Sequence, residues 1–325
     1  MVLVGDVVLL GVAVVALWIG ARSLVTGASR LASAAGISAL VVGLTVVAFG
    51  TSAPEVVVST GAALEGQGDV SVGNVVGSNV FNLGVILGIV AVIAPFRVME
   101  TLLRRDALAM AASTVVAAVV LADGVVSRLD GAILLALLGC YLGALWLAIR
   151  RENDGDGGSS GSTDGSETVP DARDRGEVRF GLEVGRVLAG LVLVIVGGRV
   201  LVDSAVGLAL AAGVSEWAIG ATVVAAGTSI PELVTSVVAA RRGNTGIAAG
   251  NVVGSNVFNV VGVLGIAAVA RPLTVDPAVF VGLAWLGVLT AFATAVLATG
   301  RRLTRLEGAL LVILGAGYSA VSLLG

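Results

Sequence analysis

Two glutamates stand alone in long apolar stretches of the sequence. Glu55 lies within VVGLTVVAFGTSAPEVVVSTGAAL, and Glu232 occupies the matching place in IGATVVAAGTSIPELVTSVVAA. An ionised carboxylate at the centre of a membrane costs at least about 2.5 to 3.5 kcal/mol on insertion scales. A carboxylate at such a depth is therefore a functional candidate, and two at matching places strengthen the case. We interpret both as cation ligands.

The residues before each glutamate offer further oxygen atoms. Pro54 and Pro231 lack an N–H group and clash with the preceding turn, so we expect each helix to break at Gly-Thr-Ser and restart at the proline. Backbone freed at membrane depth is tolerated where it lines a cavity or binds a ligand. A structural kink explains the prolines and the hydroxyls but not the two carboxylates. The candidate ligands are the carbonyls of Ala48, Thr51, Ala225 and Thr228 and the hydroxyls of Thr51, Ser52, Thr228 and Ser229.

A second motif, GNVVGSNVFN, stands at Gly73–Asn82 and recurs unchanged at Gly250–Asn259. Its Gly-x-x-x-Gly spacing indicates close helix packing. Its amides and hydroxyls need partners within an apolar run, and Asn74, Asn79 and Asn82 fall broadly on one helical face. We expect the glycines to pack and four polar side chains to face the cations, namely Ser78, Asn82, Ser255 and Asn259.

Composition restricts the chemistry to hard cations. The 325 residues are 57% hydrophobic and 13% charged, with no His, one Cys and only Arg among the 19 basic residues. These absences exclude a structural zinc site, a copper site, a Ser-His-Asp triad and a Lys Schiff base. The remaining oxygen ligands suit Na⁺ and Ca²⁺. We expect no enzyme activity, no cofactor beyond the transported ions and no nucleic-acid partner.

The motifs recur at a constant offset of 177 residues, which pairs Gly73 with Gly250 and Glu55 with Glu232. Apolar runs of about 20 residues predict five membrane spans in each half. The expected fold is an all-α polytopic membrane protein with ten helices, of which helices 2, 3, 7 and 8 are broken. The repeats span 1–149 and 180–325, and a flexible acidic linker spans 150–179. Because five is odd, the second repeat is inverted, as in many secondary transporters.

Arginine placement predicts the orientation. Most arginines between predicted spans fall on one side, including Arg104, Arg105 and Arg241, whereas Arg128 and Arg271 fall on the other. By the positive-inside rule the richer side is cytoplasmic. We therefore expect both termini outside the cell, the linker inside, and a monomer that works in the lipid bilayer of the plasma membrane.

Taken together, the motifs resemble a known family. GTSAPE and GTSIPE, each followed by GNVVGSNVFN, are similar to the two α-repeats of the sodium/calcium exchangers in the cation/calcium exchanger superfamily, and the resemblance covers both halves. It implies discontinuous helices that meet at the midplane, with Glu55 and Glu232 shared by Ca²⁺ and Na⁺. It also implies carbonyl ligands from Ala48, Thr51, Ala225 and Thr228, and neighbouring Na⁺ sites completed by Ser52, Ser229, Ser78, Ser255, Asn82 and Asn259.

One residue departs from the pattern. Archaeal exchangers of this type can carry Asp where this chain has Asn259, so the centre here has one carboxylate fewer. Potassium-dependent relatives also use Asp there, which argues against K⁺ dependence.

The expected mechanism is alternating access of a charge-neutralised centre. Two neighbouring carboxylates without a cation repel each other, and Ca²⁺ or Na⁺ ions relieve the repulsion. The first and sixth spans are expected to slide across a rigid bundle. A Ca²⁺/H⁺ antiporter would use the same carboxylates and stays open as an alternative. A cation channel does not need mirrored carboxylates, and an intramembrane hydrolase lacks a nucleophile and base.

Overall fold

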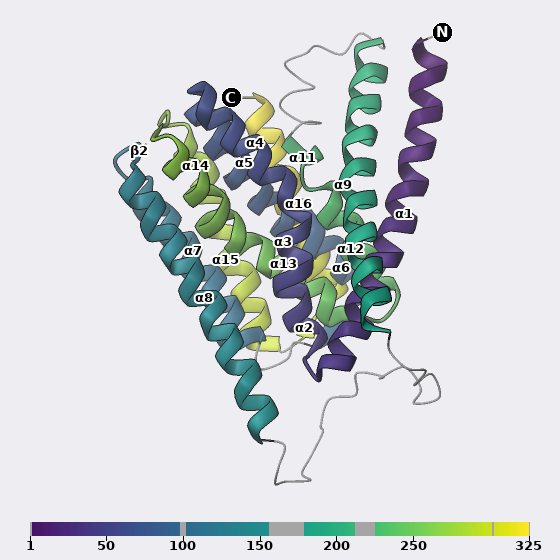
Figure 1. Ribbon diagram of the computed structural model, residues 1–325. Helices are drawn as coiled ribbons and strands as arrows, with labels where there is room; N and C mark the ends of the chain where they lie inside the picture. The colour runs from purple at the N-terminus through teal and green to yellow at the C-terminus, as the bar shows by residue number, and fades with distance from the viewer. Residues whose placement is uncertain (1, 98–101, 156–178, 212–224, 301, 325) are drawn as a thin grey trace.

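The structure is a computed structural model that describes residues 2–97, 102–155, 179–211, 225–300 and 302–324 (Figure 1). These parts of the chain are mostly helical, as predicted. Six of the described helices are long and apolar enough to cross a membrane, and a bent pair, Ala39–Thr51 with Ala53–Glu65, makes a seventh. The chain is therefore a helical membrane protein. Part of the predicted linker, and part of the stretch before the second GTS-Pro-Glu motif, lie outside the described residues.

The first half begins with one long helix and continues in shorter segments, among which π-helices are labelled η. The elements are α1 (Val2–Ala35), α2 (Ala39–Val42), η1 (Gly43–Val47), α3 (Ala48–Thr51), α4 (Ala53–Glu65), α5 (Gly68–Phe81), η2 (Asn82–Ile86), α6 (Leu87–Ile93), β1 (Phe96–Arg97), η3 (Leu102–Ala107), α7 (Leu108–Val120), β2 (Val125–Val126) and α8 (Arg128–Gly155).

The second half follows the same order. Its elements are α9 (Phe180–Ala211), α11 (Ala225–Gly227), α12 (Ile230–Arg241), α13 (Thr245–Phe258), η6 (Asn259–Val263), α14 (Leu264–Ala270), β3 (Leu273–Thr274), α15 (Val279–Gly300), β4 (Arg302–Leu303) and α16 (Arg305–Leu324). The start of α1 and the end of α16 lie at the same end of the bundle (Figure 1).

Two short antiparallel strand pairs join the halves. β1 pairs with β4 through Phe96 and Leu303, and β2 pairs with β3 through Val126 and Leu273. The offset of 177 converts Phe96 into Leu273 and Val126 into Leu303. Each strand pair is thus the repeat copy of the other with the halves exchanged, which is the pattern that a twofold relation between the halves produces.

Several helix contacts are close enough to require glycine, and two of them involve the long helices α1 and α9 and the motif helix α13. α1 and α9 pack along each other at one side of the molecule (Figure 1), where a Cβ added at Gly190 would lie 2.6 Å from the Leu24 nitrogen. α13 crosses α2 and η1, where a Cβ at Gly250 would lie 2.5 Å from the Leu40 carbonyl oxygen. The second contact confirms the predicted packing role for Gly250, whereas the prediction is wrong for Gly73 and Gly77 of the first copy, where an added Cβ would meet no neighbouring atom of the described residues within 4 Å.

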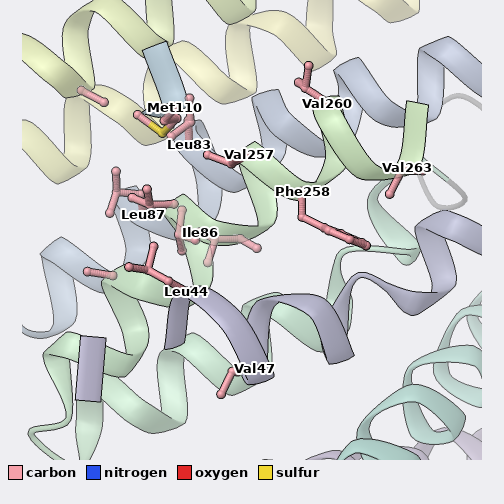
Figure 2. Close-up of a cluster of buried hydrophobic side chains, with 14 of the residues drawn as sticks. Leu44, Val47, Leu83, Ile86, Leu87, Met110, Val257, Phe258, Val260 and Val263 are labelled. Carbon is pink, nitrogen blue, oxygen red and sulfur yellow. The ribbon is translucent and has the colours of Figure 1, made fainter. Parts of the chain in front are cut away.

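The apolar core surrounds α13. Figure 2 shows Leu44 and Val47 of η1, Leu83 and Ile86 of η2, and Met110 of α7 in one cluster with side chains of α13 and η6. All of them are buried. This packing holds the GTS-Pro-Glu segments and the two GNVVGSNVFN helices against one another.

Candidate cation-binding site

Each candidate glutamate stands in the first turn of a helix that restarts at a proline. α3 and α4 meet at Ser52 with a bend of 44°, Pro54 occupies the first turn of α4, and Glu55 follows it. In the other half, Ser229 precedes α12, in which Pro231 and Glu232 take the same places. The exposed N–H groups of a helix start favour negative charge, so both carboxylates lie where the backbone stabilises them.

The two glutamates bind hydroxyls of the opposite half. Ser52 Oγ donates a hydrogen bond to Glu232 Oε1 over 3.0 Å, and Ser229 Oγ donates one to Glu55 Oε1 over 3.2 Å. The offset of 177 converts one bond into the other. All four side chains are 0% exposed. The two GTS-Pro-Glu segments therefore meet at one buried centre.

No arginine of the described residues forms an ion pair with either glutamate, although four arginines lie on the neighbouring long helices. Arg186 pairs with Glu183 at 2.6 Å. Arg30 pairs with Glu183 at 3.1 Å, and Arg199 lies 3.8 Å from Asp203. Arg22 lies over the ring of Trp18. Two buried carboxylates without a cationic side chain need another source of positive charge.

Several buried polar atoms at this centre lack a hydrogen-bond partner within the described residues. They are Oε2 of Glu55, Oε2 of Glu232, both amide atoms of Asn82, Oδ1 of Asn259 and Oγ of Ser255. Buried polar atoms in proteins are almost always paired with protein, water or an ion. The oxygens of this set fit a cation, whereas Asn82 Nδ2 is an N–H donor and cannot ligate one. Because no group of three or more acidic, His or Cys side chains lies within the described residues, the ligands besides the two glutamates must be neutral oxygens.

The amide ligand candidates stand where the third and eighth segments change their helical pitch. α5 and α13 each pass into a π-turn, at Asn82 and at Asn259. Gly68–Ile93 and Thr245–Ala270 each continue as one long helix through that turn. In these two segments the helix is therefore widened by a single π-turn without being interrupted, and π-turns of this kind are frequent at functional sites.

The structure gives partners or positions for four other predicted ligands, namely Ser78, Thr228, Ala48 and Ala225. Ser78 Oγ and Thr228 Oγ1 are 3.4 Å apart. The Ala48 carbonyl already accepts the Ser52 N–H at 3.0 Å and the Thr51 hydroxyl at 3.4 Å. Ala225 is the first residue of α11. The freed carbonyl predicted at Ala48 is thus occupied by its own chain.

Four further polar residues, which the sequence analysis did not place among the ligands, take part in this network. They are Asn74, Asn251, Ser59 and Ser236. Their signal in the sequence is the repeat itself, because Asn74 and Ser59 recur 177 residues later as Asn251 and Ser236. Asn79 is also in the network, since its Oδ1 accepts the Asn259 amide at 3.1 Å.

Comparison with known proteins agrees with the motifs. The family described as "Sodium/calcium exchanger protein" matches residues 6–147 and 182–324, which is most of the chain. The chain belongs to the sodium/calcium exchanger family. Members of this family are membrane transport proteins of the antiport type, which is a transporter class and not a class of enzymes. The predicted membership is thereby confirmed.

Relatives in bacteria and archaea align with most of this exchanger-family chain. The inner membrane protein YrbG of Escherichia coli is 41% identical over 239 residues, which cover 72% of this chain and 70% of YrbG. A sodium/calcium exchanger of Methanosarcina acetivorans is 29% identical over 303 residues, which cover 85% of this chain and 87% of that exchanger. A solved structure of the sodium-calcium exchanger NCX_Mj, soaked with Na⁺ and Ca²⁺, matches with a TM-score of 0.81 and 31% identity, covering 98% of each chain.

Proposed function

We propose that this protein is a secondary antiporter of the plasma membrane that exchanges Na⁺ for Ca²⁺. The observation that carries the proposal is the crossed pair of buried carboxylates, each held by a hydroxyl of the other half and each with one oxygen that has no hydrogen-bond partner among the described residues. Ca²⁺ binds carboxylate, carbonyl and hydroxyl oxygens. A dication at the centre neutralises Glu55 and Glu232 together, and Na⁺ ions do so in its place.

The neutral ligands of the proposed centre come from both halves. Asn82 and Asn259 offer amide oxygens at the π-turns, and the Ser255 hydroxyl has no other partner among the described residues. The Ala48 carbonyl contributes only if a cation replaces one of its two present donors. The full proposed set adds the hydroxyls of Ser52, Ser229 and Ser78 and the carbonyls of Thr51, Thr228 and Ala225.

The proposed architecture has ten spans in two inverted repeats, 1–149 and 180–325, with a cytoplasmic linker at 150–179 and both termini outside. The proposal includes breaks in helices 2 and 7 at the GTS-Pro-Glu motifs, whereas helices 3 and 8 are altered only by the π-turns at Asn82 and Asn259. The bend at Ser52 and the repeat-related strand pairs support it. A protein of this kind needs only one chain to surround the centre, so we propose a functional monomer.

Transport proceeds by alternating access. α1 and α9 pack on each other through glycines and reach the centre through their contacts with α3 and α12. We propose that this pair slides across the bundle and exposes the centre first to one side and then to the other. Apolar helices cannot cover uncompensated carboxylates at low cost, so the slide of α1 and α9 past the centre requires bound cations and couples the two ion flows.

Ca²⁺ uptake into proteoliposomes tests the proposal. Uptake is driven in one set by an outward Na⁺ gradient and in another by an outward H⁺ gradient, with Glu55→Gln as the paired variant. We expect uptake on the Na⁺ gradient alone, and its loss in Glu55→Gln. Uptake on the H⁺ gradient alone would instead identify the Ca²⁺/H⁺ antiporter, in which the same carboxylates carry protons. A Glu55→Gln protein that exchanges at the normal rate would overturn the proposal.

A further inference from the structure

Two three-membered hydrogen-bond chains connect the halves beside the proposed cation centre. In the first, Thr51 Oγ1 lies 3.2 Å from Asn251 Oδ1, and Asn251 Nδ2 lies 2.9 Å from Ser236 Oγ. We name this chain the Thr51 relay. In the second, named the Thr228 relay, Thr228 Oγ1 lies 3.2 Å from Asn74 Oδ1, and Asn74 Nδ2 lies 3.0 Å from Ser59 Oγ.

The surrounding acceptors determine how each amide is oriented. The Ser59 hydroxyl donates its proton to the Ser71 carbonyl at 3.1 Å, so its oxygen can only accept from Asn74 Nδ2. Asn251 Nδ2 also faces the Glu232 carbonyl at 3.4 Å, and a carbonyl only accepts. Both asparagines therefore turn Oδ1 towards a threonine hydroxyl. Thr228 donates its proton to Asn74 Oδ1 at 3.2 Å, and Thr51 shares its proton between Asn251 Oδ1 at 3.2 Å and the Ala48 carbonyl at 3.4 Å.

The threonines held in this way belong to the ligand-bearing segments. Thr51 adjoins Ser52, whose hydroxyl binds Glu232, and Thr228 adjoins Ser229, whose hydroxyl binds Glu55. Each relay thus attaches one GTS-Pro-Glu segment to a helix of the other half, α13 for Thr51 and α5 for Thr228. Thr51, Asn251 and Ser236 are 0% exposed, so water does not compete for the bonds of the Thr51 relay, whereas Asn74 and Thr228 are partly exposed.

We infer that Asn74 and Asn251 are positioning residues that set the cation affinity of the centre by holding Thr228 and Thr51 in place. This inference rests on the proposed function. Neither asparagine makes a hydrogen bond to a glutamate carboxylate among the described residues, so each acts through its threonine. The occurrence of the relay in both halves, with every member exchanged by the same offset, gives two copies of the device in one chain.

The test is a double-mutant cycle read as the Ca²⁺ concentration at half-maximal uptake in proteoliposomes. Its variants are Asn251→Ala, Thr51→Val and their double, and the matched control is Asn251→Ala with Thr228→Val, which joins members of different relays. Each single change should raise the half-maximal concentration about tenfold, the effect of one lost hydrogen bond. The Thr51→Val/Asn251→Ala double should stay within about twofold of Thr51→Val, whereas the control double should reach about a hundredfold.

Three results separate the explanations. The inference is wrong if the effects of Thr51→Val and Asn251→Ala on the half-maximal Ca²⁺ concentration multiply in the double variant, as they do in the control double. It is also wrong if Asn251→Ala lowers only the melting temperature, because the relay is then structural. If Asn251→Ala does not fold, the same cycle with Asn74→Ala and Thr228→Val decides, because Asn74 is only half-buried. Glu55→Gln is measured alongside, and full uptake activity of that variant overturns the proposed function. If Glu55→Gln loses activity but the effects of the two relay changes multiply in their double variant, only the inference about the relay is overturned.

Discussion

At the centre of the molecule, each buried glutamate and its hydroxyl partner come from different halves of the chain. Neither half alone can therefore complete the proposed cation site. The serine hydroxyl donates to the carboxylate when the centre holds no cation, and a bound cation can use the same hydroxyl oxygen as a ligand. Both states depend on the serine, which makes Ser52 and Ser229 sensitive probes of the centre.

We predict that Ser52→Ala raises the Na⁺ concentration needed for half-maximal exchange about tenfold, because one hydroxyl ligand is lost. Ser229→Ala should do the same to within about threefold, since the two positions are related by the repeat. The measurement is Na⁺-dependent Ca²⁺ uptake. Ser33→Ala is the control, because Ser33 is exposed and binds only its own helix. Equal Na⁺ dependence in all variants would exclude both serines from the site.

At the residue scale, the sequence predicts which residues are unusual but not which residues they contact. Glu55 and Glu232 are recognisable because a carboxylate in an apolar run is costly. The crossed pairing depends on how the halves fold together, which no local pattern encodes. For the same reason Asn74 and Asn251 were not distinguishable from the other asparagines of their motif.

At the scale of the elements, glycine decides how closely the helices approach the centre. Gly250 allows the backbone of α13 to contact that of α2 and η1, and Gly43 makes the same contact from the other side, where an added Cβ would lie 2.7 Å from the Ile247 carbonyl oxygen. The Gly-x-x-x-Gly pattern predicted this packing. It did not predict the π-turns at Asn82 and Asn259, although each turn contains a glycine, Gly84 and Gly262.

We expect Gly250→Ala to destabilise the protein by about 1 to 3 kcal/mol, because the new methyl group meets backbone atoms that cannot move independently. Thermal unfolding in detergent measures the effect. Gly139→Ala on α8 is the matched control, since no neighbouring atom of the described residues lies within 4 Å of its added Cβ. This control should not destabilise the protein, because alanine has a higher helix propensity than glycine. Equal melting temperatures for the two variants would contradict the close crossing.

Glu183 joins the two long helices. Its Oε1 accepts from Arg30 of α1 at 3.1 Å and from Arg186 of α9 at 2.6 Å, and its side chain is 3% exposed. Glu183→Ala should lower the melting temperature by at least about 3 °C, because it leaves two arginines without their shared partner. Asp203→Ala, in an exposed pair on the same helix, should change it by less than about 1 °C. The reverse order would show that the buried pair is not what links α1 to α9.

At the scale of the whole molecule, the duplication organises both the strand pairs and the polar centre. The sequence predicts this duplication directly, because identical motifs recur at one offset. The number of spans stays a prediction, since only six or seven helices of the described residues satisfy the length and hydropathy of a span by themselves. Shorter helices, such as α7 with 13 residues and α12 with 12, do not reach the length of a span by themselves.

The inverted arrangement predicts that equivalent turns face opposite sides of the membrane. Glu65, at the turn between α4 and α5, is equivalent by the offset to Arg242, at the turn between α12 and α13, and Arg241 lies next to it. In a Cys140→Ser background, Glu65→Cys should react with a membrane-impermeant thiol reagent in intact cells. Arg241→Cys should react only after permeabilisation. Labelling of both from the same side would rule out inversion.

Equilibrium Ca²⁺ binding to the purified protein tests the central claim, that Glu55 and Glu232 together form one cation site. We predict saturable binding that Na⁺ competes away, a loss of at least about a hundredfold in affinity for Glu55→Gln and for Glu232→Gln, and no measurable binding for the double variant. Glu65→Gln, an exposed carboxylate at the end of the same α4 helix, should bind like the unchanged protein. Binding by the double variant at the original affinity would contradict the account.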